Sequence, residues 1–243
     1  MRPATSPARN AIVPASFNPP VRVWDLPTRL FHWALVACVT GALVTIKLGG
    51  TYMDWHVRFG LATVGLVAFR LIWGLIGPRY ARFATFLRGP VGVWRYLSGK
   101  TPAPAGHNPL GAWSVIAMLL VIGFQAVSGL FANDDILTQG PLAHTIDGSL
   151  SGTLTWLHSQ NEWIIYGLIA LHLLAILWYT LVRRKRLVTP MVTGNARASD
   201  LPERAPAAED GPSVWLRAIV LAAAATALVL WINAQQAAMS LSF

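Results

Sequence analysis

The chain has 243 residues, of which 54% are hydrophobic and only 12% are charged. A soluble domain usually carries about twice that charged fraction, so most of these residues face something other than water. The formal net charge of +9 would suit a nucleic-acid-binding protein, but the basic residues alternate between connections instead of forming one patch. Composition therefore indicates a protein of the lipid bilayer and argues against a nucleic-acid partner.

Five apolar runs are each near the roughly 20 residues that a helix needs to cross the hydrocarbon of a bilayer. In chain order they are Leu30–Leu48, Val57–Ile76, Ala112–Phe131, Trp163–Val182 and Val214–Ile232. We predict an all-α membrane protein with a four-helix transmembrane bundle over residues 21–194. Residues 1–20 are expected to be a flexible tail, 195–212 a linker rich in proline and alanine, and 213–243 an additional transmembrane helix.

The charged residues predict the orientation of these helices. Lys and Arg precede the first run, fill the connection between the second and third runs, and follow the fourth run. The connection 132–157, between the third and fourth runs, holds Asp134, Asp135 and Asp147 and no Lys or Arg. Because Lys and Arg mark cytoplasmic connections, we expect a multi-pass protein with its N terminus in the cytoplasm and its C terminus on the opposite side.

Four of the six histidines lie in or at the ends of the predicted helices, at His32, His56, His158 and His172. Ionisable side chains are costly inside a membrane and usually have a function and a partner there. His172 follows His158 by 14 residues, so on one helix the two stand roughly 21 Å apart and within about 40° of one face. The directions of the helices place His32 at the depth of His172 and His56 at the depth of His158. We therefore predict two histidine pairs inside the bundle.

Two imidazoles that face each other across a bundle are the axial ligands of a low-spin b haem, an arrangement that favours electron transfer over oxygen chemistry. A zinc site would need its ligands at one depth. A dinuclear metal site would need carboxylates beside the histidines, and we expect none on these helices. Covalent c-type haem is excluded because the chain has no CxxCH motif. The predicted cofactors are thus two haem b groups with bis-histidine ligation.

Haem propionates are anionic and need cations nearby. Arg70 lies 14 residues after the histidine of the second helix, on the same face, and is the favoured partner at the cytoplasmic depth. Arg29 and Arg22 are alternatives there, and Arg58 is the candidate at the external depth. The alternative for every one of these arginines is that its side chain snorkels to lipid headgroups. His107 is interpreted as a capping or interface residue, and His144 as a solvated loop residue.

Several stretches between residues 21 and 194 carry a family resemblance: VRVWDLPTRLFHW, WHVRFG, FRLIWGLIGPRYARF, GHNPLG, VSGLFANDD, HSQNEWIIYGLIALH and RRKRLVTPMVTG. Together they resemble the bacterial cytochrome b561 and nickel–iron hydrogenase b-type cytochrome family. The resemblance implies a four-helix unit with two b haems, held by histidines of the first, second and fourth helices, in the bacterial inner membrane. It also implies electron transfer between the quinone pool and a periplasmic hydrogenase or c-type cytochrome.

The expected function is therefore that of an electron-transfer subunit. Quinone binding is implied only by the family, because no stretch of the chain marks a quinone site. Quinone oxidoreductase activity, the direction of electron flow and a homodimer are left open. The alternative is a membrane anchor or transporter with structural histidines, although the broken helices or repeat symmetry of a transporter are not evident.

Overall fold

The computed structural model describes residues 20–240 apart from 103, 137 and 203–204, so all but the last residue of the expected 1–20 tail lies outside the described part. Within these residues, five helices are long and apolar enough to cross a membrane. They are α1 (Leu26–Leu48), α2 (Met53–Ile76), α5 (Pro109–Leu130), α6 (Gly148–Leu181) and α8 (Pro212–Ser240). The predicted all-α bundle with a fifth, C-terminal helix is confirmed.

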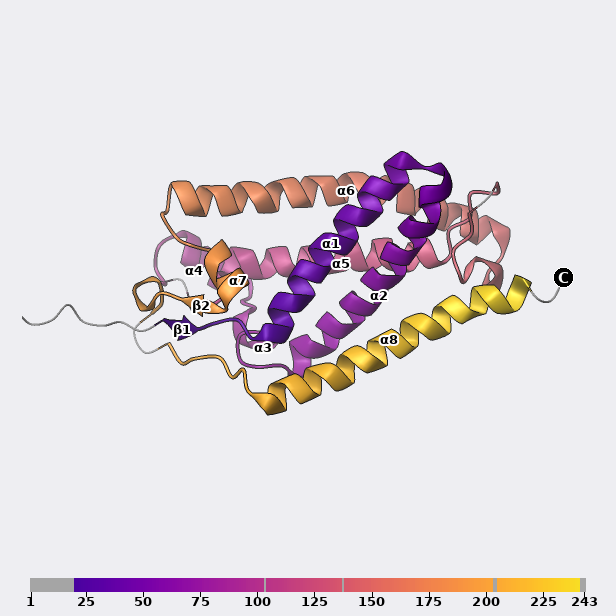
Figure 1. Cartoon of the computed structure of the whole chain (residues 1–243). Helices are drawn as coiled ribbons and strands as arrows, with labels where there is room; N and C mark the ends of the chain where they lie inside the picture. The colour runs from indigo at the N-terminus through magenta and orange to yellow at the C-terminus, as the bar shows by residue number, and fades with distance from the viewer. Residues whose placement is uncertain (1–19, 103, 137, 203–204, 241–243) are drawn as a thin grey trace, which may run out of the picture.

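The long helices are arranged around α2. The helices α1 and α2 form a hairpin joined by the short helix η1 (Gly50–Tyr52), and α2 packs against α1, α5 and α8. The helix α6 lies along α5. In Figure 1, α6 and α8 run on opposite sides of the α1–α2 hairpin.

The bundle has two ends with different structure (Figure 1). The strand end holds β1 (Val21–Arg22) and β2 (Asn195–Ala196), with the short helices α3 (Phe83–Phe86), α4 (Pro90–Leu97), α7 (Val188–Thr193) and η3 (Ala198–Asp200). The loop end holds η1 and the segment 131–147, which includes η2 (Ala143–Thr145). The α1 and α5 helices begin at the strand end, whereas α2 and α6 begin at the loop end.

Capping side chains set where three of the long helices begin. Asp25, Asn108 and Asp147 directly precede α1, α5 and α6, and each accepts a hydrogen bond from a backbone N–H of the first turn. The cap at Asp147 starts α6 well before the apolar run at Trp163. The expected external loop 132–157 is therefore helical from Gly148, because polar residues continue a capped helix beyond its membrane-length part.

Asp25 also joins the start of α1 to the end of α2. Its carboxylate is fully buried and accepts from the Thr28 hydroxyl at 2.8 Å and from the Trp73 indole N–H at 3.2 Å. Burial raises the pKa of Asp25, against the opposing effect of the hydrogen bonds from Thr28 and Trp73. The motif WDLPT thus fixes α1 on α2 at the strand end.

The segment 195–212, expected to be a linker, connects α7 to α8 and also packs against the start of the core. The strands β1 and β2 pair antiparallel, with Arg22 opposite Asn195. Beyond them, Ala208 N–H donates to the Arg22 carbonyl at 2.7 Å, and Arg22 forms an ion pair with Asp210 at 2.6 Å. The chain between the four-helix core and α8 is therefore held at the strand end.

The fifth helix packs along α2. A Cβ at Gly65 of α2 would lie 2.9 Å from a methyl group of Val229, so this glycine allows α8 to approach closely. Large apolar side chains elsewhere remain exposed on the outer faces, among them Leu120, Trp163 and Leu171, each more than 60% exposed. Such faces suit lipid rather than water.

Candidate haem-binding sites

The structure brings His56 of α2 and His158 of α6 together at the loop end. Their ring centroids are 6.1 Å apart and the ring planes are inclined by 88°. A metal bound at about 2 Å by one nitrogen of each imidazole would hold the two centroids roughly 6 Å apart. The spacing of this pair, called the loop-end pair below, therefore fits an iron between the rings.

Hydrogen bonds orient both rings of the loop-end pair. His56 Nδ1 lies 2.9 Å from the Ala42 carbonyl, which can only accept, so Nδ1 carries the proton. His158 Nδ1 lies 3.1 Å from Ser128 Oγ, whose own proton is donated to the Gln125 carbonyl. Nδ1 of His158 is therefore also the donor. Each ring is left with a free lone pair on Nε2, which is the atom a metal would bind.

His32 of α1 and His172 of α6 form the second pair, called the strand-end pair. They lie close enough to interact electrostatically. The α6 helix runs unbroken from Gly148 to Leu181, so its two histidines stand roughly 21 Å apart along one helix. One helix thus supplies a member of each pair, and the partners come from α1 and α2. This is the grouping that the spacing and helix directions indicate, and ligation of haem by the four histidines stays a prediction.

Arg70 of α2 is buried at the strand end of the bundle. Its side chain is 3% exposed, its guanidinium lies 4.7 Å from the Phe83 ring centroid, and it interacts electrostatically with Asp25. Its Nη1 has no hydrogen-bond partner among the described residues. A buried cation without a hydrogen-bonded counter-charge is strongly unfavourable, so this position suits an anionic group with oxygen acceptors. Haem propionates fit that requirement.

The other predicted arginines differ in their surroundings. Arg29 donates from Nη1 to the Val192 carbonyl at 2.6 Å, while its buried Nε has no partner in the described chain. Arg29 therefore retains a donor at the strand end. Arg58 is exposed, with its guanidinium 5.1 Å from the Trp55 ring centroid, and no described contact joins it to the loop-end pair.

His107 lies at the strand end and interacts electrostatically with Arg70 and His32. The sequence did not indicate this position. The capping residue of α5 is its neighbour Asn108, and the His107 ring packs between Trp24 and Phe86 at centroid distances of 4.7 Å each. Burial, then Arg70 and His32, lower the pKa of His107 to about 3, so its imidazole is neutral. The sequence signal was its position directly before a helix cap, but its ring neighbours come from distant segments.

One expectation about the helices was wrong, because a carboxylate does lie near the loop-end pair. Glu162 follows His158 by one turn of α6 and interacts electrostatically with both histidines of that pair. It forms an ion pair with Lys47 of α1 at 2.7 Å and accepts from the Tyr166 hydroxyl at 2.6 Å. The described residues still contain no group of three or more His, Cys, Asp or Glu side chains that could hold a metal ion.

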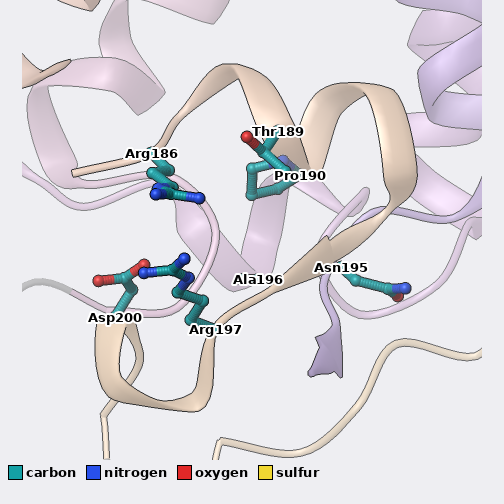
Figure 2. A pocket seen from close by; sticks show the side chains of 7 residues that line it. All are labelled: Arg186, Thr189, Pro190, Asn195, Ala196, Arg197 and Asp200. Atoms are coloured by element: carbon teal, nitrogen blue, oxygen red, sulfur yellow. The ribbon is translucent and has the colours of Figure 1, made fainter. Parts of the chain in front are cut away.

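A pocket at the strand end has no histidine in its lining. It is formed by residues of α7, β2 and η3 and by two arginines that flank these elements, and Figure 2 shows its lining: Arg186, Thr189, Pro190, Asn195, Ala196, Arg197 and Asp200. No member of either histidine pair lines it, so it is not part of the candidate haem sites.

Comparisons with known proteins find relatives of the four-helix part of the chain. The family model described as prokaryotic cytochrome b561 matches residues 23–194. A probable Ni/Fe-hydrogenase 1 B-type cytochrome subunit of Escherichia coli is 21% identical over 211 residues, covering 71% of this chain and 88% of that protein. Probable Ni/Fe-hydrogenase B-type cytochrome subunits of Bradyrhizobium diazoefficiens and Rhodobacter capsulatus are 21% and 23% identical over 221 residues. They cover 75% and 74% of this chain and 88% and 82% of their own lengths. The chain therefore belongs to the prokaryotic cytochrome b561 family, as a membrane b-type cytochrome of electron transfer.

Proposed function

We propose that this chain is a di-haem electron-transfer subunit that connects the membrane quinone pool with a redox partner outside the membrane. The observation that carries the proposal is the pairing of four histidines by one continuous helix, α6, with α1 and α2. Haem b, when bound, supplies reversible one-electron oxidation and reduction of its iron. The protein's own residues hold the group and tune it.

His56 and His158 would bind one haem, and His32 and His172 the other. At the loop-end pair, hydrogen bonds to Ala42 and Ser128 occupy the two Nδ1 atoms, so Nε2 of each ring is the nitrogen that would bind the iron. At the strand-end pair, Arg70 and Arg29 would neutralise the propionates. Two histidines for each haem would leave the iron without a free position for oxygen, which supports a carrier of electrons rather than an oxidase.

The charge at the two ends supports an orientation. Basic residues gather at the strand end, in the α2–α5 connection and at residues 183–186. In the loop-end segment 131–147, by contrast, every Asp, Glu, Lys or Arg residue is an Asp. By the positive-inside rule the strand end is cytoplasmic and the loop end periplasmic, in the bacterial inner membrane. The relatives are named as subunits of Ni/Fe hydrogenases. We infer that the partner is a periplasmic hydrogenase or a c-type cytochrome, docking at the loop end.

A spectroscopic experiment tests the ligation. The reduced-minus-oxidised spectrum and the pyridine haemochrome of the purified protein should give two b haems per chain. Substituting His56 or His158 by Ala should remove one component, and substituting His32 or His172 should remove the other. The exposed His144 provides a matched control whose Ala variant should keep both. A protein without b-type absorbance would refute the proposal and favour a membrane anchor. If His56→Ala and His172→Ala removed the same component, the pairing would be refuted.

A further inference from the structure

His107 is held rigidly at the strand end by its neighbours in the chain. Gly106 has φ +85°, and a Cβ there would lie 3.2 Å from the Tyr80 ring and 3.6 Å from Trp24, so a glycine is required. Asn108 caps α5 by accepting from Gly111 N–H at 2.8 Å and donates to the Tyr179 hydroxyl at 2.9 Å. The backbone on both sides of His107 is therefore fixed.

The His107 side chain is positioned by packing against two aromatic rings. Trp24 and Phe86 lie on the ring at 4.7 Å, tilted by 59° and 48°. Nδ1 is buried and has no partner within the described chain. An imidazole held this firmly, with an unsatisfied buried nitrogen, is arranged for a group that the chain itself does not supply.

Unsatisfied buried atoms occur at one end of the bundle only, within the part of the chain that the structure describes. They are Arg29 Nε, His32 Nδ1, Arg70 Nη1 and His107 Nδ1. His107 interacts electrostatically with both Arg70 and His32, and Arg29 precedes His32 on α1 by three residues, about one helical turn. At the loop-end pair, by contrast, both Nδ1 atoms have partners. Two cations and a neutral imidazole with free donors match an anion with several oxygen acceptors.

We propose that His107 is a positioning residue for the strand-end haem, donating a hydrogen bond from Nδ1 to a propionate carboxylate that Arg70 and Arg29 also contact. The inference rests on the proposed function. His107 is not an axial ligand in this scheme, because His32 and His172 are assigned that role and because His107 belongs to the connection before α5. Its neutral N–H donor partly offsets the carboxylate charge and so favours the reduced haem.

The test compares two substitutions at His107 in the haem-loaded full chain. His107→Phe keeps a ring between Trp24 and Phe86 but removes the donor, whereas His107→Gln restores an amide N–H. Redox titration should show a lower midpoint potential of the strand-end haem in His107→Phe. The expected shift is up to about 59 mV, which corresponds to a tenfold change in the equilibrium constant of a one-electron reduction. The Gln variant should recover most of this shift. The loop-end potential should stay unchanged in both and so reports that the bundle is folded.

Three results would overturn the inference. An unchanged strand-end potential in His107→Phe would show that the imidazole makes no such bond. An equal shift at both haems, without rescue by Gln, would show a general structural effect. Loss of the low-spin spectrum at the strand end alone would make His107 an axial ligand. A wild-type protein without haem would instead refute the proposed function, so the two failures are distinguishable.

Discussion

Gly129→Ala tests the loop-end site by a purely steric change. Gly129 lies on α5 against the His158 imidazole, and a Cβ at this position would be 2.8 Å from Cε1 and 3.3 Å from Nδ1 of that ring. Ordinary contacts of a Cβ begin at 3.4 Å, so the ring must move by roughly 0.6 Å within a close-packed interior. This movement also disturbs the 3.1 Å hydrogen bond from Nδ1 to Ser128.

The expected magnitude follows from the role of that hydrogen bond. Loss of a group that orients a metal-ligating histidine typically weakens metal binding by about 10–100-fold. We therefore expect Gly129→Ala to weaken haem retention at the loop-end pair by about 10–100-fold, and to leave the strand-end haem in place. Haem transfer from the purified protein to excess apomyoglobin, followed at the absorbance of each component, measures the two retentions separately.

Gly123→Ala is the matched control on the same helix. A Cβ at Gly123 would meet only a Val67 methyl group at 3.5 Å, which is an ordinary contact. This variant should release both haems at the wild-type rate. Equal retention in Gly129→Ala and Gly123→Ala, or a loss confined to the strand-end haem, would refute the reasoning.

Three further changes have definite expected signs. Arg70→Met should raise the melting temperature of the haem-free protein and lower that of the haem-loaded protein, because it removes a buried cation whose Nη1 would gain a hydrogen-bond partner only from the haem; the same sign in both forms would contradict this. Asp134→Asn with Asp135→Asn should slow association with a basic redox partner and flatten its salt dependence in stopped-flow reduction, whereas a rate independent of salt would mean that the loop is acidic only by topology. Hydrogen bonds from Ser149 and Leu150 lower the pKa of Asp147. The cap therefore stabilises α6 fully at pH values above the ordinary pKa of an Asp, and this stabilisation is lost as the pH falls through the lowered pKa of Asp147. The melting-temperature difference between the wild type and Asp147→Ala should accordingly be present at pH 6 and vanish in strong acid, and a difference that persists there would count against the cap.

The parts that the sequence predicted are those that depend on one helix at a time. Apolar length gave the five spans, and a spacing of 14 residues gave two depths for His158 and His172. The extent of α6 was missed because its first turns are polar and hydropathy does not detect a capped helix outside the apolar run. Contacts between different helices were harder still to predict. Glu162 is visible one turn after His158, but its pairing with Lys47 depends on how α1 meets α6.

His107 illustrates the same difference between local structure, which the sequence predicts, and contacts between distant segments. The string GHNPLG indicates a tight turn, a cap and a helix start from residue types alone. That the ring would lie between Trp24 and Phe86, beside Arg70, depends on three segments that meet only in the folded chain. Residues whose surroundings come from several elements are therefore the ones that sequence patterns assign least well.

The division of the ligands among the helices has a consequence for biogenesis. On the proposed ligation, the histidines of α1 and α2 emerge from the ribosome early, yet neither has a partner until α6 is synthesised, as far as His158 for His56 and as far as His172 for His32. A nascent chain that ends before α6 therefore has two single histidines and no site with both axial ligands. Haem insertion becomes a late event, and the α1–α2 hairpin must persist in the membrane without cofactor until the fourth long helix arrives.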